Sequence, residues 1–214
     1  MPFGIKKSQL GWILILGSFW GFSEAALGMG LRSCASFVSG SVMTGFALFF
    51  IAATWAIAQN AISVALLIVV AGLFKLFDAL LLSLPVMHGA VANPIFAFLM
   101  EGMAFLFIIA VFNEKLREKT YGRAVMGGLG ALVAVNLFPL VKFATGIPAC
   151  IVPGTGFPLA LYYAPLAVAL SLITVPAGLW LGERAGSLGR NFREIASPAA
   201  LILCLVLVVA MRLL

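Results

Sequence analysis

Residues 61–84 read AISVALLIVVAGLFKLFDALLLSL, an apolar run interrupted by only two charged side chains, Lys75 and Asp78. A helix needs about 20 apolar residues to cross roughly 30 Å of hydrocarbon, so this stretch is long enough to span a bilayer. Strands of a membrane barrel would alternate apolar and polar residues instead. Because the backbone must satisfy its own hydrogen bonds in hydrocarbon, the run predicts a transmembrane helix.

The rest of the chain repeats this pattern. Of its 214 residues, 64% are hydrophobic and 9% are charged, a balance far from that of a soluble domain. The longest polar connectors, 113–123 and 183–194, are too short to form a soluble domain. We therefore expect one integral membrane domain over residues 1–214, an all-α polytopic bundle of six to seven transmembrane helices, the last at the short limit for a span. The predicted spans are residues 9–31, 41–59, 61–84, 94–112, 124–144, 160–181 and 197–213.

The basic residues predict the orientation of the chain. The net charge of +6 resides largely in short loops between apolar spans, a pattern that indicates membrane topology and not nucleic-acid binding. Cytoplasmic loops are enriched in Lys and Arg. An inside amino terminus places most of the basic residues in inner segments, so we expect a cytoplasmic (inner) membrane protein with that orientation. The inner set is Lys6, Lys7, Lys115, Arg117, Lys119, Arg123, Arg184, Arg190 and Arg193.

The cysteines indicate neither a metal site nor a cofactor. Cys34, Cys150 and Cys204 have no Cys-x-x-Cys spacing and only His88 to join them, which is not the pattern of a zinc or iron–sulfur site. Cys204 lies in an apolar run and is expected to pack there. Cys34 and Cys150 fall in predicted loops on the same side, where they are either disulfide-bonded or two free thiols.

Ionisable residues inside the spans gather at the outer end of the predicted bundle. Glu24 lies past the middle of the first span, Glu101 lies about two turns into the fourth, and Lys75 and Asp78 lie in the outer part of the third. A charge in hydrocarbon costs roughly 2.5 to 3.5 kcal/mol, so these groups are expected to face one another or a wet cavity. We therefore expect a polar pocket that faces the extracytoplasmic side. The same end also holds Arg32, His88, Asn93 and Lys142.

Each of these residues has a structural interpretation as well. Lys75 and Asp78 are three apart and can neutralise each other on one helical face. Glu24 and Glu101 have no opposite charge at helical spacing, so each must meet a partner on another helix, bind a cation or remain protonated. His88 is either an exposed loop residue or a ligand contact. The expected substrate-binding set is Glu24, Glu101, Lys75, Asp78, Trp20, His88 and Asn93.

Aromatic residues and an apolar loop accompany the polar set. Trp20 either lines the cavity at the depth of Glu24 or packs toward lipid, and Tyr162 and Tyr163 are most simply interface anchors. Together with the carboxylates, such rings would suit a small organic molecule carrying an amine or a ring. Residues 145–163, TGIPACIVPGTGFPLALYY, form either a re-entrant or capping loop over the pocket or an ordinary tight turn.

The first span carries a stripe of small residues, Gly17, Gly21 and Ala25, at four-residue spacing. Small residues at this spacing let another helix backbone approach closely. The stripe therefore predicts either internal packing of the bundle or docking of a separate subunit.

The segments FWGFSEAALG (19–28), GSVMTGFALFF (40–50), LFKLFDALLL (73–82) and NPIFAFLMEGMAFLF (93–107) carry a family resemblance. The chain resembles the S-components, the substrate-binding subunits, of energy-coupling factor (ECF) vitamin transporters over roughly residues 10–182. The resemblance implies six helices, a pocket near the outer face, and a complex with a transmembrane coupling protein and two cytoplasmic ATPases. It also implies docking of the coupling protein on the stripe of Gly17, Gly21 and Ala25. The seventh span and the lack of a vitamin-specific motif depart from the family, and the opening MPFGIKK lacks the histidine of its metal-transporting branch.

Two functions remain open at this point. The first is a transport protein that captures a small, vitamin-like organic solute, with the lipid bilayer, other membrane subunits and cytoplasmic ATPases as partners and no nucleic acid. The second is a non-catalytic anchoring or accessory subunit of a larger respiratory or redox complex. No Gly-x-Ser-x-Gly or His-Glu-x-x-His element occurs in the sequence, so an enzyme is not expected.

Overall fold

The computed structural model describes residues 5–28, 37–146, 150–185 and 190–213, which are almost entirely helical and contain no strand. A single isolated bridge joins Ile151 and Pro158. The elements are α1 (Lys7–Leu27), α2 (Phe37–Ala58), α3 (Ala61–Leu81), α4 (Gly89–Val111), α5 (Glu114–Glu118), α6 (Thr120–Leu137), the 3-10 turn η2 (Phe138–Leu140), α7 (Val141–Thr145), α8 (Leu159–Ala185) and α9 (Arg190–Leu213).

Within the described residues, 7 helices are long and apolar enough to cross a membrane. They are α1, α2, α3, α4, α6, α8 and α9, so the expected all-α polytopic bundle is confirmed. The last span, Ile195–Leu213, has 19 residues and meets the length requirement that its sequence left in doubt. Residues 195–213 also form the least buried of the seven spans, with 17% of the window buried.

Several predicted boundaries differ from the structure, and two of the differences lie at prolines. The fourth helix begins at Gly89, where the His88 side chain accepts a hydrogen bond from the Ala90 amide as its N-cap. Pro94 lies inside this helix, so Asn93 belongs to α4 and not to the preceding loop. The fifth predicted span is not continuous, because α6 ends at Leu137 and the Pro139 turn leads into the short α7.

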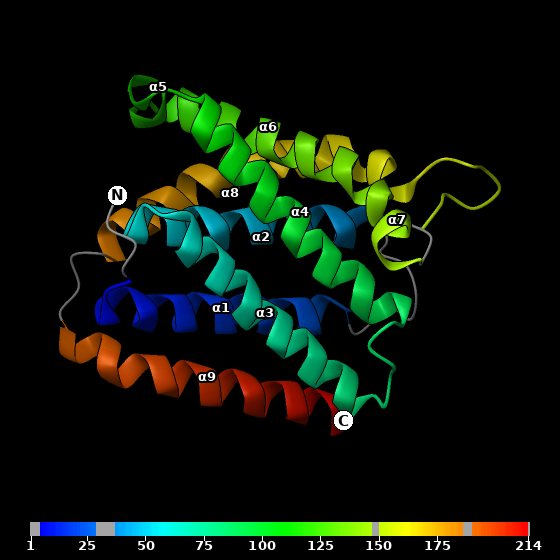
Figure 1. The fold of residues 1–214 in the computed structure, drawn as a ribbon, viewed down its shortest axis with the longest axis horizontal. Helices are drawn as coiled ribbons and strands as arrows, with labels where there is room; N and C mark the ends of the chain where they lie inside the picture. The colour runs from blue at the N-terminus through cyan, green and yellow to red at the C-terminus, as the bar shows by residue number, and fades with distance from the viewer. Residues whose placement is uncertain (1–4, 29–36, 147–149, 186–189, 214) are drawn as a thin grey trace.

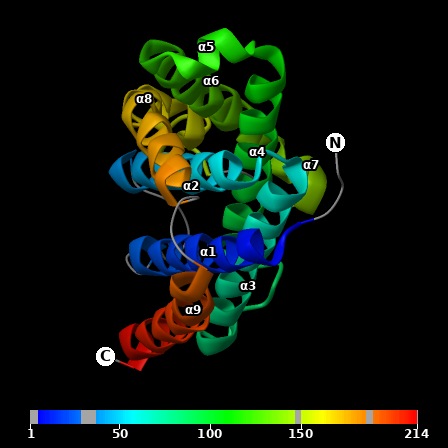
Figure 2. The same ribbon diagram turned by 90° about the vertical axis from the view of Figure 1, so that its left-hand side faces the viewer.

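The long helices stack side by side (Figure 1). Helix α8 packs between α2 and α6, and α1 packs against α3 and α9. Helices α3 and α4 cross this stack on one side, as the end view shows (Figure 2). The described amino- and carboxyl-terminal ends lie at opposite ends of the bundle, as an odd number of spans requires.

Glycines allow the closest helix contacts. A Cβ at Gly178 or Gly182 of α8 would collide with the backbone carbonyls of Phe49 or Ala53 in α2. The backbones of α2 and α8 therefore touch directly, which brings the first turns of both helices together at one end of the bundle. That end also receives the last turns of α1, α3 and α6.

The stripe of small residues on α1 is also internal. A Cβ at Gly17 would lie 2.7 Å from Val70 Cβ, and one at Gly21 would overlap the Phe74 ring. Ala25 is buried beside Phe74. Docking of a separate subunit on this stripe, with Gly17, Gly21 and Ala25 as contacts, stays an untested prediction, and α3 occupies this face of α1 in the structure. These contacts support the alternative interpretation, internal packing of the bundle.

Candidate functional site

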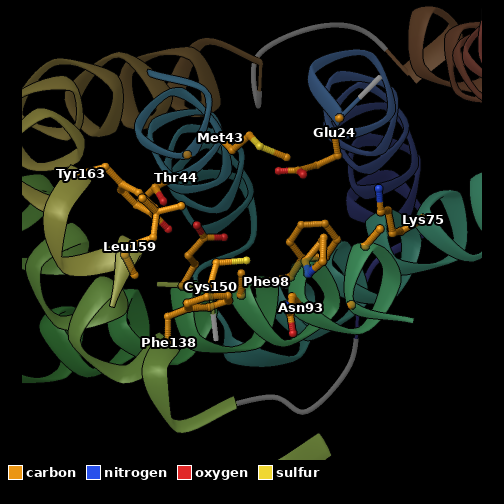
Figure 3. A pocket seen from close by; sticks show the side chains of 18 residues that line it. Glu24, Met43, Thr44, Lys75, Asn93, Phe98, Phe138, Cys150, Leu159 and Tyr163 are labelled. Carbon is orange, nitrogen blue, oxygen red and sulfur yellow. The ribbon is translucent and has the colours of Figure 1, made fainter. Parts of the chain in front are cut away.

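A cavity of about 110 Å³ lies at the end of the bundle where α1, α3 and α6 end and α2, α4 and α8 begin (Figure 3). Its lining combines charged, polar and aromatic side chains. The lining residues are Glu24, Gly28, Gly40, Met43, Thr44, Lys75, Gly89, Ala90, Asn93, Pro94, Ala97, Phe98, Glu101, Phe138, Cys150, Leu159, Ala160 and Tyr163.

Helical spacing brings the polar groups to this cavity. Asn93, Ala97 and Glu101 recur every four residues along α4, so they share one face of that helix. Glu24 lies on α1 and Lys75 on α3, and both helices reach the cavity with their last turns. The four polar residues Glu24, Lys75, Asn93 and Glu101 of the expected set thus line one chamber.

The two cavity carboxyl groups are buried and close enough to influence each other. Glu24 is 3% exposed and Glu101 is 5% exposed. Their charges repel, while the Lys75 ammonium attracts Glu24 and the Thr44 hydroxyl interacts with Glu101. Among the described residues, no basic group lies within the 4.0 Å of an ion pair from either carboxylate.

Lys75 is shared between the cavity and a second buried group. Its Nζ lies 3.5 Å from Asp78 Oδ2, so the expected pairing within α3 is confirmed. Asp78 itself is held by Arg212 of α9, whose Nε and second guanidinium nitrogen donate hydrogen bonds of 2.6 and 2.9 Å. Asp78 is therefore a buried ion-pair residue that orients Lys75, and it does not line the cavity as expected.

Two other expected site residues lie away from the cavity wall. Trp20 is fully buried, with its ring centroid 4.8 Å from that of Phe98, so it faces neither lipid nor the chamber. Its indole nitrogen is buried and has no hydrogen-bond partner among the described residues. His88 is partly buried and caps α4. Trp20 thus supports the wall from behind, and His88 shapes the entry of the chain into α4.

The structure adds neutral residues that were not in the expected substrate-binding set. Met43 and Thr44 of α2 and Tyr163 of α8 line the cavity opposite Lys75 (Figure 3). Tyr163 was expected to anchor the membrane interface. Its ring instead packs so closely against Gly40 that a Cβ there would lie 2.7 Å from Tyr163 Cε1. Gly40 is therefore a wall residue whose missing side chain makes room for the tyrosine.

The loop before α8 is a tight turn that projects from the bundle (Figure 1). The Val152 amide donates to the Phe157 carbonyl, and Gly154 takes a positive φ of 77° at the tip. Ile151 and Phe157 are about half exposed, so the ordinary-turn interpretation is confirmed for residues 150–158. Cys150, at the base, lines the cavity and is disulfide-bonded. Arg32 and Cys34 lie outside the described residues.

No family model, curated protein or solved structure matches this chain. The site must therefore be interpreted from its own geometry. Within the part of the chain that the structure describes, no group of three or more His, Cys, Asp or Glu side chains is arranged to hold a metal ion. The chamber offers two carboxyl groups, one ammonium, neutral hydroxyls and aromatic rings, a set suited to binding a small organic molecule by charge, hydrogen bonds and ring contact.

Proposed function

We propose that this protein captures a small organic solute in the cavity lined by α1, α2, α3, α4 and α8. The observation that carries the proposal is the pair Glu24 and Glu101, both buried at one cavity and neither ion-paired within the described residues. An ionisable group buried in a membrane bundle is costly and typically marks a ligand or ion site. A bound solute supplies the partners that these carboxyl groups lack.

The solute would enter from the extracytoplasmic side. The cavity lies at the end of the bundle opposite the described amino-terminal end, and the excess of Lys and Arg at that amino-terminal end favours its placement in the cytoplasm. Together with the resemblance to ECF S-components, this arrangement supports a substrate-binding subunit of a multi-subunit transporter for a vitamin-like solute.

The test is to identify what the purified protein carries. Small molecules released from the detergent-purified protein by denaturation are compared by mass spectrometry for wild type, Glu24→Gln and Glu101→Gln. We expect a solute in the wild type that falls by about tenfold or more in both variants, because each loses a buried charged contact. Thermal unfolding of each variant verifies that the bundle is intact.

Glu114→Gln is the matched control, since the Glu114 side chain is 88% exposed at the other end of the bundle. This variant should release as much solute as the wild type. An identical set of small molecules from the wild type and both cavity variants would reject the cavity as the site. Co-purifying ATPases would support the transporter role, whereas redox subunits would favour an accessory subunit of a respiratory complex.

A further inference from the structure

The buried charges near the cavity do not balance within the described residues. Three carboxyl groups, Glu24, Asp78 and Glu101, accompany two basic groups, Lys75 and Arg212. Full ionisation of these five groups therefore leaves one negative charge in excess among the described residues. Because uncompensated charge is unfavourable in a membrane interior, this imbalance indicates what a bound molecule must supply.

The excess is located at Glu24 and Glu101. Asp78 is already satisfied by two hydrogen bonds from Arg212 and by Lys75. Glu24 Oε2 is buried and has no hydrogen-bond partner in the part of the chain that the structure describes, and the Glu24 carboxylate points into the cavity (Figure 3). An unused acceptor beside a second carboxyl group favours a donor that carries positive charge, because hydrogen bonds between opposite charges are the stronger ones.

The space and the neutral wall restrict the rest of the ligand. Cavities of roughly 150 Å³ accommodate benzene, so about 110 Å³ admits a group near the size of one small ring. Phe98, Phe138 and Tyr163 contribute aromatic rings to the wall, and ring faces attract cations as well as apolar groups.

We infer that the solute is an organic monocation, in which a protonated amine lies between Glu24 and Glu101 and a ring-sized apolar body contacts the aromatic wall. This inference rests on the proposed function and specifies its substrate class. One positive charge neutralises the excess, and the N–H groups of an ammonium supply the donors that the two carboxylates need.

The test uses three compounds that share one ring and differ in charge: benzylamine, benzyl alcohol and benzoate. Binding of each to the purified wild-type protein is measured by calorimetry at millimolar concentration. We expect benzylamine to bind about tenfold or more tightly than benzyl alcohol, and benzoate not to bind. In Glu24→Gln and in Glu101→Gln the preference for the amine over the alcohol should largely disappear, while Glu114→Gln keeps it.

The wild-type comparison stands even where a variant fails to fold. Equal binding of the alcohol, tighter binding of benzoate, or binding of Na⁺ without any amine binding overturns the monocation inference. So does the absence of benzylamine binding. A neutral or anionic solute released from the wild type and lost from the cavity variants would also overturn it, yet would leave solute capture standing. Only an unchanged set of released molecules in those variants rejects both solute capture at this cavity and the monocation inference.

Discussion

Gly21 is the residue at which the contact between α1 and α3 is tightest. A Cβ there would overlap Phe74 Cβ and Cγ, both close to the backbone of α3 and unable to move far. We expect Gly21→Ala to lower the free energy of unfolding by about 1–3 kcal/mol, the usual cost of overpacking. Unfolding of the purified protein by a denaturing detergent, followed by circular dichroism, measures the change.

Gly72 is the matched control on α3, because no heavy atom lies within 4 Å of the position of its absent Cβ. Gly72→Ala should be neutral or should stabilise the helix by about 0.5–1 kcal/mol, since alanine loses less entropy than glycine on folding. Equal stabilities for the two variants would show that the Gly17, Gly21 and Ala25 stripe is not packed against α3, and would reopen that face to a partner subunit.

Single residues of the candidate site were predictable where they were chemically rare. Glu24, Lys75 and Glu101 stood out because an ionisable side chain within an apolar span is costly and must have a reason to be there. Tyr163 and Met43 gave no such signal, since an aromatic or apolar side chain suits lipid, core and cavity equally well. Trp20 shows the same ambiguity. The sequence placed it at the depth of Glu24, but it did not indicate that the ring packs behind the cavity wall, against Phe98.

At the scale of the helices, the Asp78–Arg212 pair joins α3 to α9 near their carboxyl ends. Replacing Arg212 by Gln leaves the buried Asp78 carboxylate with Lys75 at 3.5 Å as its remaining basic neighbour. Breaking a buried pair by removing one partner typically costs about 3–5 kcal/mol, so we expect a loss of this size for Arg212→Gln. Denaturation in detergent measures it, and limited proteolysis should cut α9 earlier than in the wild type.

The Arg123–Glu183 pair, which joins α6 to α8 at the other end, is the comparison. The Glu183 side chain is 49% exposed, so Arg123→Gln should cost about 1 kcal/mol or less. A small effect of Arg212→Gln, no larger than that of Arg123→Gln, would contradict the view that Asp78 depends on α9.

Helix existence was predictable from the apolar runs, but helix contacts were not. Spacing within α3 identified the Lys75–Asp78 pair, whereas Arg212 is 134 residues away from Asp78 and no local pattern connects them. The start of α4 was misplaced for a related reason. Pro94 marked a helix boundary in the sequence, but a proline near the first turns of a helix disturbs few backbone hydrogen bonds.

At the scale of the molecule, the seven spans of the described residues place the described terminal ends on opposite sides of the membrane, and the cavity lies on the side of the described carboxyl-terminal end. The fold defines these two sides but does not say which one faces the cytoplasm. The distribution of Lys and Arg over the connecting loops supplies that direction, and solute capture from outside depends on it. The proposed function therefore requires that the cavity end of the bundle faces away from the cytoplasm.

Cysteine labelling in intact cells tests this orientation. Thr155 is exposed in the turn before α8, on the cavity side, and Glu118 is exposed in α5 at the other end. A membrane-impermeant maleimide should label Thr155→Cys above the wild-type background of the native cysteines, and should label Glu118→Cys only after the cells are permeabilised. Labelling of Glu118→Cys in intact cells with Thr155→Cys protected would place the cavity toward the cytoplasm. Solute capture from the exterior would then be excluded, because the chamber would have no access to that side.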